Sequence, residues 1–253
     1  MNILAGFADV SLGQLVLVGG MALLASVIGG LAGCGTGALM PLVLVPLVGA
    51  EPVVPIIAIS AIFTNISRFV AYFRYADRRR ALIVIGAAML TTALGAYGYT
   101  RLTSAGAAFV IGGMLILSVP LRRLAKHRDI KISDTGLGVS AVGYGVVVGG
   151  TSGSGVILLS LLMASGLEGA AVIATDAVIS VATGLIKILV FGLAGVVTAQ
   201  VLAFALLIGA IAIPGAFLAK AFVERMPVHI HTAILDAAVI VGGLVMVTAA
   251  LRH

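Results

Sequence analysis

Long apolar runs separated by short polar gaps dominate this chain. A helix needs about 20 apolar residues to span the hydrocarbon core of a bilayer, and the third to fifth runs of each half approach that length. The second run of each half is too short, and we expect a re-entrant piece or half of a broken helix there. The ten runs cover residues 12–33, 36–50, 52–73, 81–101, 105–121, 136–151, 154–167, 169–191, 198–222 and 231–251.

Four short motifs recur in the same order in both halves of the chain. Each match is weak alone in a sequence so rich in Gly, Ala and Leu, but four in order indicate a duplication. We therefore divide the chain into an N-terminal repeat (1–126) and a C-terminal repeat (135–253), with a basic linker over 122–134. The matched motifs begin at Gly29 and Gly149, Ala58 and Ala174, Gly95 and Gly215, and Gly112 and Gly242.

Basic residues lie in different gaps of the two halves. In the first half they follow the third run, whereas the matching gap, Gly192 to Val197, carries no charge. In the second half they follow the fourth run, where the first half has only Arg101. Because Lys and Arg concentrate in cytoplasmic loops, we predict two inverted-topology repeats of about five segments each, with both termini outside. The basic groups are Arg74, Arg78, Arg79 and Arg80, and Lys220, Arg225, His229 and His231.

The composition agrees with lipid as the solvent of this protein. Of the 253 residues, 61% are hydrophobic and 9% are charged, against roughly 25% charged residues in soluble proteins, and the mean hydropathy is +1.26. The net charge of +6 lies mainly in the gaps between apolar runs, so it indicates membrane topology rather than nucleic-acid binding. We predict an all-α polytopic membrane protein.

The third run of each half carries polar residues on one helical face. They recur at i, i+4 and i+7, which places them within about 60° of arc. Ionisable residues inside a membrane segment are costly and usually functional, so we interpret the two stripes as a pathway for an anion attracted by Arg68 and Lys187, with Asn65 pointing elsewhere. The candidate residues are Ser60, Thr64, Ser67 and Arg68 in the first half, and Thr175, Asp176, Ser180, Thr183 and Lys187 in the second.

A structural explanation stays open for the same residues. Hydroxyl groups can donate to carbonyl groups of their own helix, and Asp176 can join two helices as readily as it can carry a coupling proton. Asp176 and Lys187 cannot pair directly, because residues i and i+11 lie about 16 Å apart along a helix axis. Lys187 stands near its helix end, so it can also extend to the membrane interface.

Glycine-rich motifs open the second run of each half. No strand precedes them, so a dinucleotide or phosphate loop is not indicated. At a break between short helices, glycine lets backbone N–H groups turn toward a ligand, and helix N-termini favour an anion. The alternative is tight helix packing by small residues, which is also the favoured role of the single cysteine. The candidates are Gly33, Cys34, Gly35 and Thr36, and Thr151, Ser152, Gly153 and Ser154.

The remaining polar residues indicate neither catalysis nor a metal site. His229 and His231 do not share a helix face and lack further ligands. No Ser/His/Asp or Cys/His arrangement is apparent in the sequence. We predict no enzymatic activity, no cofactor and no nucleic-acid partner. The expected partners are a small anionic substrate and the lipid bilayer, and a homo-oligomer stays open.

These motifs resemble the TauE/SafE family, the sulfite exporter or toluene-sulfonate-uptake-permease type. The likeness rests on GGLAGCGTGALMPLVL, GGTSGSGVILLSLLM and ATDAVISVATGLIKILVFG and covers essentially the whole chain. Glycine-type positions are replaced at Cys34, Thr36, Ser154 and Val156. The resemblance implies a secondary transporter of sulfite, sulfoacetate or another organosulfonate, usually outward, across the bacterial cytoplasmic (inner) membrane. The residues alone indicate a small anion, with a passive channel or an intramembrane enzyme using Cys34 as alternatives.

Overall fold

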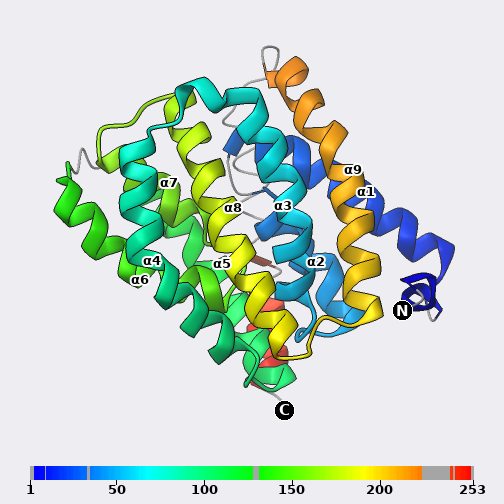
Figure 1. Ribbon diagram of the computed structural model, residues 1–253. Coiled ribbons are helices and arrows are strands. Elements are labelled where there is room, and N and C mark those ends of the chain that lie inside the picture. Colours follow the sequence, from blue (N-terminus) through cyan, green and yellow to red (C-terminus); the bar gives the residue numbers. More distant parts are fainter. Residues whose placement is uncertain are drawn as a thin grey trace.

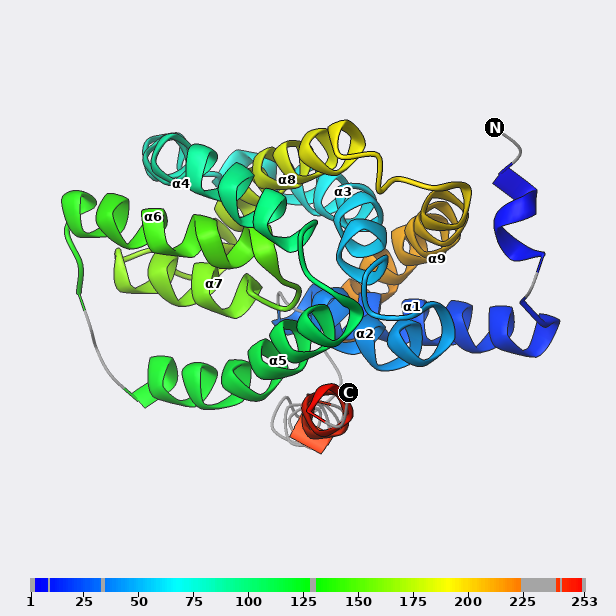
Figure 2. The same ribbon diagram turned by 90° about the horizontal axis from the view of Figure 1, so that it is seen from below.

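Helices form the regular structure throughout the part of the chain that the structure describes. The computed structural model describes residues 3–8, 10–32, 35–127, 131–223, 240–241 and 243–251, arranged as in Figures 1 and 2. The α-helices are α1 (Leu12–Ala32), α2 (Gly35–Val48), α3 (Val53–Tyr72), α4 (Arg78–Tyr99), α5 (Ser104–His127), α6 (Asp134–Gly150), α7 (Gly155–Ala164), α8 (Ala170–Leu193) and α9 (Ala199–Val223). A short 3-10 helix, η1 (Ile3–Phe7), precedes them and another, η2 (Phe73–Tyr75), follows α3. The all-α prediction is confirmed.

α5 extends into the segment that we expected to be a basic linker. We expected the linker to begin at Arg122, but α5 continues through His127. Arg, Leu, Ala and Lys are strong helix formers, and the sequence between these two residues contains no Gly or Pro. The helix therefore extends beyond the apolar run, because helix propensity and not hydropathy sets its end.

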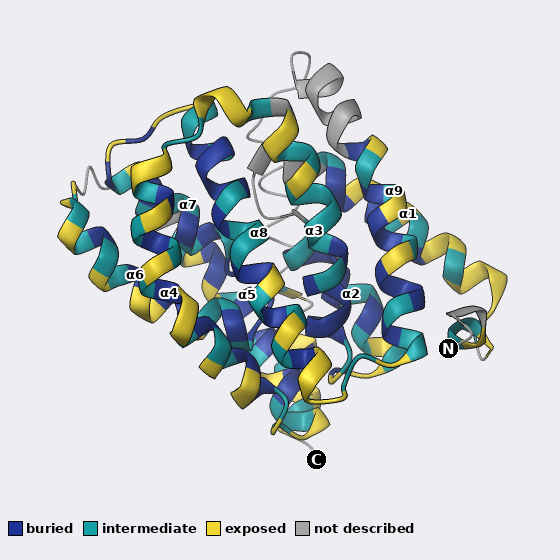
Figure 3. Cartoon of the chain, viewed as in Figure 1, coloured by how far each residue is buried: buried dark blue, intermediate teal, exposed yellow. Residues whose placement is uncertain are grey.

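Lipid-facing side chains cover the outer surface of the bundle. Four helical stretches among the described residues are long and apolar enough to cross a membrane: Val53–Val70, Arg78–Tyr99, Ser104–Leu121 and Ala170–Leu193. Large apolar side chains on outer faces are widely exposed, as Leu90 (71%) and Leu193 (82%) illustrate (Figure 3). Water does not stabilise so much contiguous apolar surface, whereas hydrocarbon does. The chain is a multi-pass membrane protein.

The predicted short helices are α2 and α7. α7 has 10 residues, or about 15 Å of helix, which is half of the hydrocarbon thickness. Its end is a Schellman turn, in which Gly166 N–H donates to Met163 O (2.9 Å) and Leu167 N–H to Leu162 O (3.2 Å). Gly166 has φ +90°, a conformation that residues with a Cβ rarely adopt. This glycine therefore stops α7 partway through the bundle.

The central helices α3 and α8 lie side by side, with α4 and α6 on one flank and α1 and α9 on the other (Figures 1 and 2). Two glycines permit these close flanking contacts. A Cβ at Gly95 would overlap the backbone of α6, and a Cβ at Gly215 would overlap Ser26 of α1. α4 thus packs closely on α6, and α9 packs closely on α1, each at one of these glycines.

Candidate functional site

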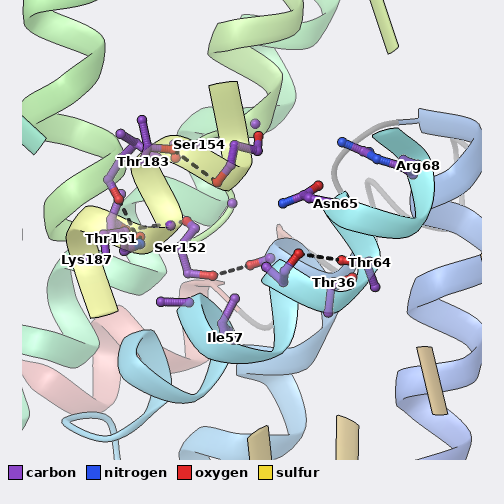
Figure 4. A pocket seen from close by; sticks show the side chains of 18 of the residues that line it. Thr36, Ile57, Thr64, Asn65, Arg68, Thr151, Ser152, Ser154, Thr183 and Lys187 are labelled. Carbon is purple, nitrogen blue, oxygen red and sulfur yellow. Dashed lines mark hydrogen bonds between the residues drawn. The ribbon is translucent and has the colours of Figure 1, made fainter. Parts of the chain in front are cut away.

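A cavity of about 140 Å³, lined by both polar and apolar residues, lies between α3 and α8, where the two glycine-rich motifs meet. By the same measure a water molecule needs about 10–15 Å³, so the space suits a small oxyanion with a few waters. Figure 4 shows side chains from α3 on one side of the space and from α8 and the second glycine-rich motif on the other. Tyr144 and Val148 of α6 and Ser26 of α1 complete the lining.

Most of the predicted contact residues line this cavity. They are Thr36, Thr64, Arg68, Thr151, Ser152, Gly153, Ser154, Ser180, Thr183 and Lys187. Ser60, Ser67, Thr175 and Asp176 do not line it, although Asp176 contacts a lining residue. Gly35 is the first residue of α2, and the predictions for Gly33 and Cys34 lie outside the described residues.

Lys187 places an ammonium group in the cavity wall. The residue is 6% exposed, and its Nζ donates to the carbonyl oxygens of Val148 (2.8 Å) and Thr151 (3.2 Å) at the end of α6. These bonds satisfy carbonyls that a helix end leaves unpaired, and a cation is favourable there. An ammonium group has three donors, so one remains for a ligand. None of the salt bridges between described residues involves Lys187.

The second cation of the cavity, Arg68, is paired with a carboxylate. Its guanidinium donates to Oδ2 of Asp176, which joins α3 to α8. The side chains are 11% and 1% exposed, respectively. Within the described residues, Nε of Arg68 and Oδ1 of Asp176 have no hydrogen-bond partner. Arg68 can therefore donate to a second acceptor while its charge is balanced by Asp176.

Thr175, next to Asp176, anchors the start of α4. Its hydroxyl oxygen accepts from the backbone N–H of Asp77 (3.0 Å), which is the N-cap of α4. Asp77 accepts from the backbone N–H of Arg80 (3.0 Å) and pairs with its guanidinium (2.7 Å). The backbone hydrogen bond from Arg80 is the largest cause that holds the pKa of Asp77 below its usual value. Thr175 therefore has a structural role at the end of the cavity helices.

Hydroxyl groups on the central helices donate to their own backbones. Thr64 Oγ1 donates to Ala61 O (3.0 Å), and Thr183 Oγ1 donates to Ile179 O (3.0 Å). This is the alternative left open by the sequence, and these two groups present lone pairs to the cavity unless they rotate. The side-chain amide of Asn65 has no hydrogen-bond partner among the described residues, and it extends into the cavity (Figure 4). Its NH₂ group is a ready donor.

Asn65 points away from the hydroxyl stripe, as expected, but this side of α3 is the one that faces the cavity. Taking Thr64 as zero, the lining residues of α3 cover about 0–120° of the helical wheel, with Asn65 near 100°. Ser60 and Ser67 fall at about −40° and −60° on the same wheel. The cavity face of α3 is therefore turned away from the hydroxyl stripe, and Thr64 lies at the edge they share.

The two glycine-rich motifs contact each other at one end of the cavity. Ser152 Oγ donates to Gly37 O (2.5 Å), and a Cβ at Gly37 would lie 2.9 Å from the Gly153 nitrogen. Gly153 itself has φ +83°. Helices α2 and α7 both begin here, and Thr36 and Ser154 at their N-terminal ends line the cavity. Helix N-termini carry unpaired N–H groups and positive partial charge, so both favour an anion.

Sequence reasoning missed Tyr144 and Ser26 in the lining. Both lie in apolar runs to which we assigned no site residue apart from the glycine-rich ends, and their only sequence signal is a polar atom within an apolar helix. Ser26 Oγ donates to Ala212 O (2.5 Å), which joins α1 to α9. No group of three or more His, Cys, Asp or Glu residues that could hold a metal ion occurs in the described ranges.

A helical bundle with exposed apolar outer faces and a cavity lined in part by polar side chains is typical of a multi-pass membrane protein. The chain belongs to the sulfite exporter TauE/SafE family, whose sequence profile matches residues 18–246. It is therefore a transporter of the sulfite exporter type, and the family is one of membrane transporters and not of enzymes. No curated protein and no solved structure matched the chain.

Proposed function

We propose that this protein is a secondary transporter that exports a small sulfur-containing anion, such as sulfite or an organosulfonate, across a bacterial inner membrane. The observation that carries the proposal is the cavity between α3 and α8, which combines the Lys187 ammonium, the Asn65 amide and the N-termini of α2 and α7. Charge-assisted and neutral donors around a compact space suit a sulfur oxyanion. The family supports both the substrate class and the outward direction.

We further propose that the two halves are inverted repeats that alternate access to this cavity. The swapped basic loops support opposite orientations, and the matched packing of α4 on α6 and α9 on α1 supports a twofold relationship. In inverted-repeat transporters the substrate lies where the repeats meet, beside broken helices. The short helices α2 and α7 and the contact between their glycine-rich motifs suit that plan.

Flux into proteoliposomes tests this function. Sulfite and a monosulfonate are expected to enter vesicles that contain the protein and not empty vesicles. Lys187→Met is expected to reduce the flux about tenfold or more, because it removes a charge-assisted donor from the site. Lys131→Met is the matched control, since Lys131 is exposed in the segment before α6.

Two outcomes contradict the proposal. Absence of flux for every sulfur anion with folded protein refutes the substrate class, and full flux in the Lys187 variant removes this residue from the site. Uphill accumulation driven by an imposed pH gradient distinguishes a coupled transporter from a passive channel. The same experiment tests the prediction that Asp176 carries the coupling proton, since Asp176→Asn then abolishes the response to the gradient.

A further inference from the structure

The formal charges of the ionisable side chains at the cavity can be added directly. Arg68 and Lys187 line the cavity with two positive charges, and Asp176 contributes one negative charge through its salt bridge to Arg68. The ion pair of Asp77 with Arg80 adds no net charge. With each group in its usual ionised form, the described side chains at the cavity therefore sum to one positive charge, which lies on Lys187.

We infer that the cavity selects anions by valence and takes a monovalent oxyanion, and that Asp176 is the residue that sets this selectivity. The inference rests on the proposed function, and it narrows the substrate class to monosulfonates and the hydrogen form of sulfite. Dianions such as sulfate and sulfoacetate are poor ligands. Asp176 does not line the cavity and acts in its ionised form. Its carboxylate neutralises Arg68, so Arg68 cannot serve as the counter-ion for a second charge on the substrate.

The physical reason is the cost of an unpaired buried charge. A monovalent anion beside Lys187 leaves the site neutral, whereas a dianion leaves one negative charge without a counter-ion beside buried side chains. The carboxylate of Asp176 also repels the second charge, and this repulsion is weakly screened because the residue is 1% exposed. The partial charges at the N-termini of α2 and α7 favour any anion and do not replace a full counter-charge.

Methanesulfonate and sulfate are the probes that isolate valence. They share a tetrahedral sulfur centre and similar size, and they differ by one charge because a methyl group replaces an oxygen. Binding to the purified full-length protein is measured by calorimetry in detergent, and uptake of the radiolabelled anions is measured in proteoliposomes. The wild-type protein is expected to prefer methanesulfonate by about tenfold or more.

Three variants distinguish the effect of the net charge at the cavity from the effect of losing one side-chain contact. Asp176→Asn raises the sum to two and is expected to increase sulfate affinity about tenfold, which removes or reverses the preference. The double variant Arg68→Gln/Asp176→Asn restores a sum of one with a neutral hydrogen-bonded pair, so the preference for methanesulfonate returns. Asp134→Asn is the matched control, because Asp134 pairs with Arg79 at an exposed site.

Equal affinity of the wild-type protein for both probes overturns the inference, and the proposed function survives because transport itself is intact. An unchanged preference in Asp176→Asn also overturns it. Gel filtration establishes that each variant is folded. If Asp176→Asn does not fold, the double variant still decides, since a reversed preference at an unchanged charge sum refutes the valence rule.

Discussion

Gly112→Ala tests whether duplicated glycines hold helices of the bundle together. A Cβ at Gly112 of α5 would lie 2.8 Å from Gly243 O and 3.0 Å from Met246 Cβ. Ordinary contacts of a Cβ lie at 3.4–4 Å, so the two segments must separate by about 0.5 Å, and overpacking of this kind costs about 1–3 kcal/mol. In a membrane the hydrophobic effect does not hold two helices together, so the loss of this close packing is not offset by apolar burial.

Gly113→Ala is the matched control for this prediction. A Cβ at Gly113 meets nothing within 4 Å, and both substitutions share the gain of about 1 kcal/mol in helix propensity. The difference between the two variants therefore isolates the packing cost. Reversible unfolding of the purified protein in mixed detergent micelles gives both free energies of unfolding. Equal stability of the two variants refutes the claim that Gly112 and Gly243 permit a close helix contact.

Two further predictions concern a buried hydroxyl and the topology. Tyr99→Phe is expected to lower the free energy of unfolding by about 1 kcal/mol, since the buried Tyr99 hydroxyl donates to Ala50 O (2.7 Å). Tyr97→Phe, which removes an exposed hydrogen bond from Arg101, is expected to have a smaller effect, and equal losses contradict the argument. Reporter insertions are expected to place the loop 74–80 inside the cell and the loop 192–197 outside. Readings on the same side refute the inverted repeat.

Hydropathy and periodicity predicted the helices, because both depend on local residue order. The ends of α3 and α8 fall within three residues of the predicted runs. The break before α7 was predictable as well, because its glycines interrupt an apolar run. The sequence therefore located the elements that form the cavity, together with the two cations in its wall.

The sequence did not predict which face of α3 lines the cavity, nor that Arg68 pairs with Asp176. Which face of a helix lines a cavity depends on how its neighbours pack, and the cavity borders α6 as well as α8. An ion pair across 108 positions depends on the relative height of two helices, which no local pattern encodes. Asn65 is an example. It lies outside the hydroxyl stripe that we took to face the pathway, so the sequence did not identify it as a cavity residue.

The hydrogen bond from Ser152 to Gly37 has a consequence for biosynthesis. Its two partners are 115 positions apart, and at about 5–20 residues per second a ribosome takes about 6–23 seconds to add that length. During this interval the Gly37 carbonyl lacks its final partner, and hydrocarbon offers no substitute. The first glycine-rich motif must therefore remain hydrated at the insertion machinery or the membrane surface until the second emerges, so the nascent N-terminal half cannot settle into lipid in its finished form.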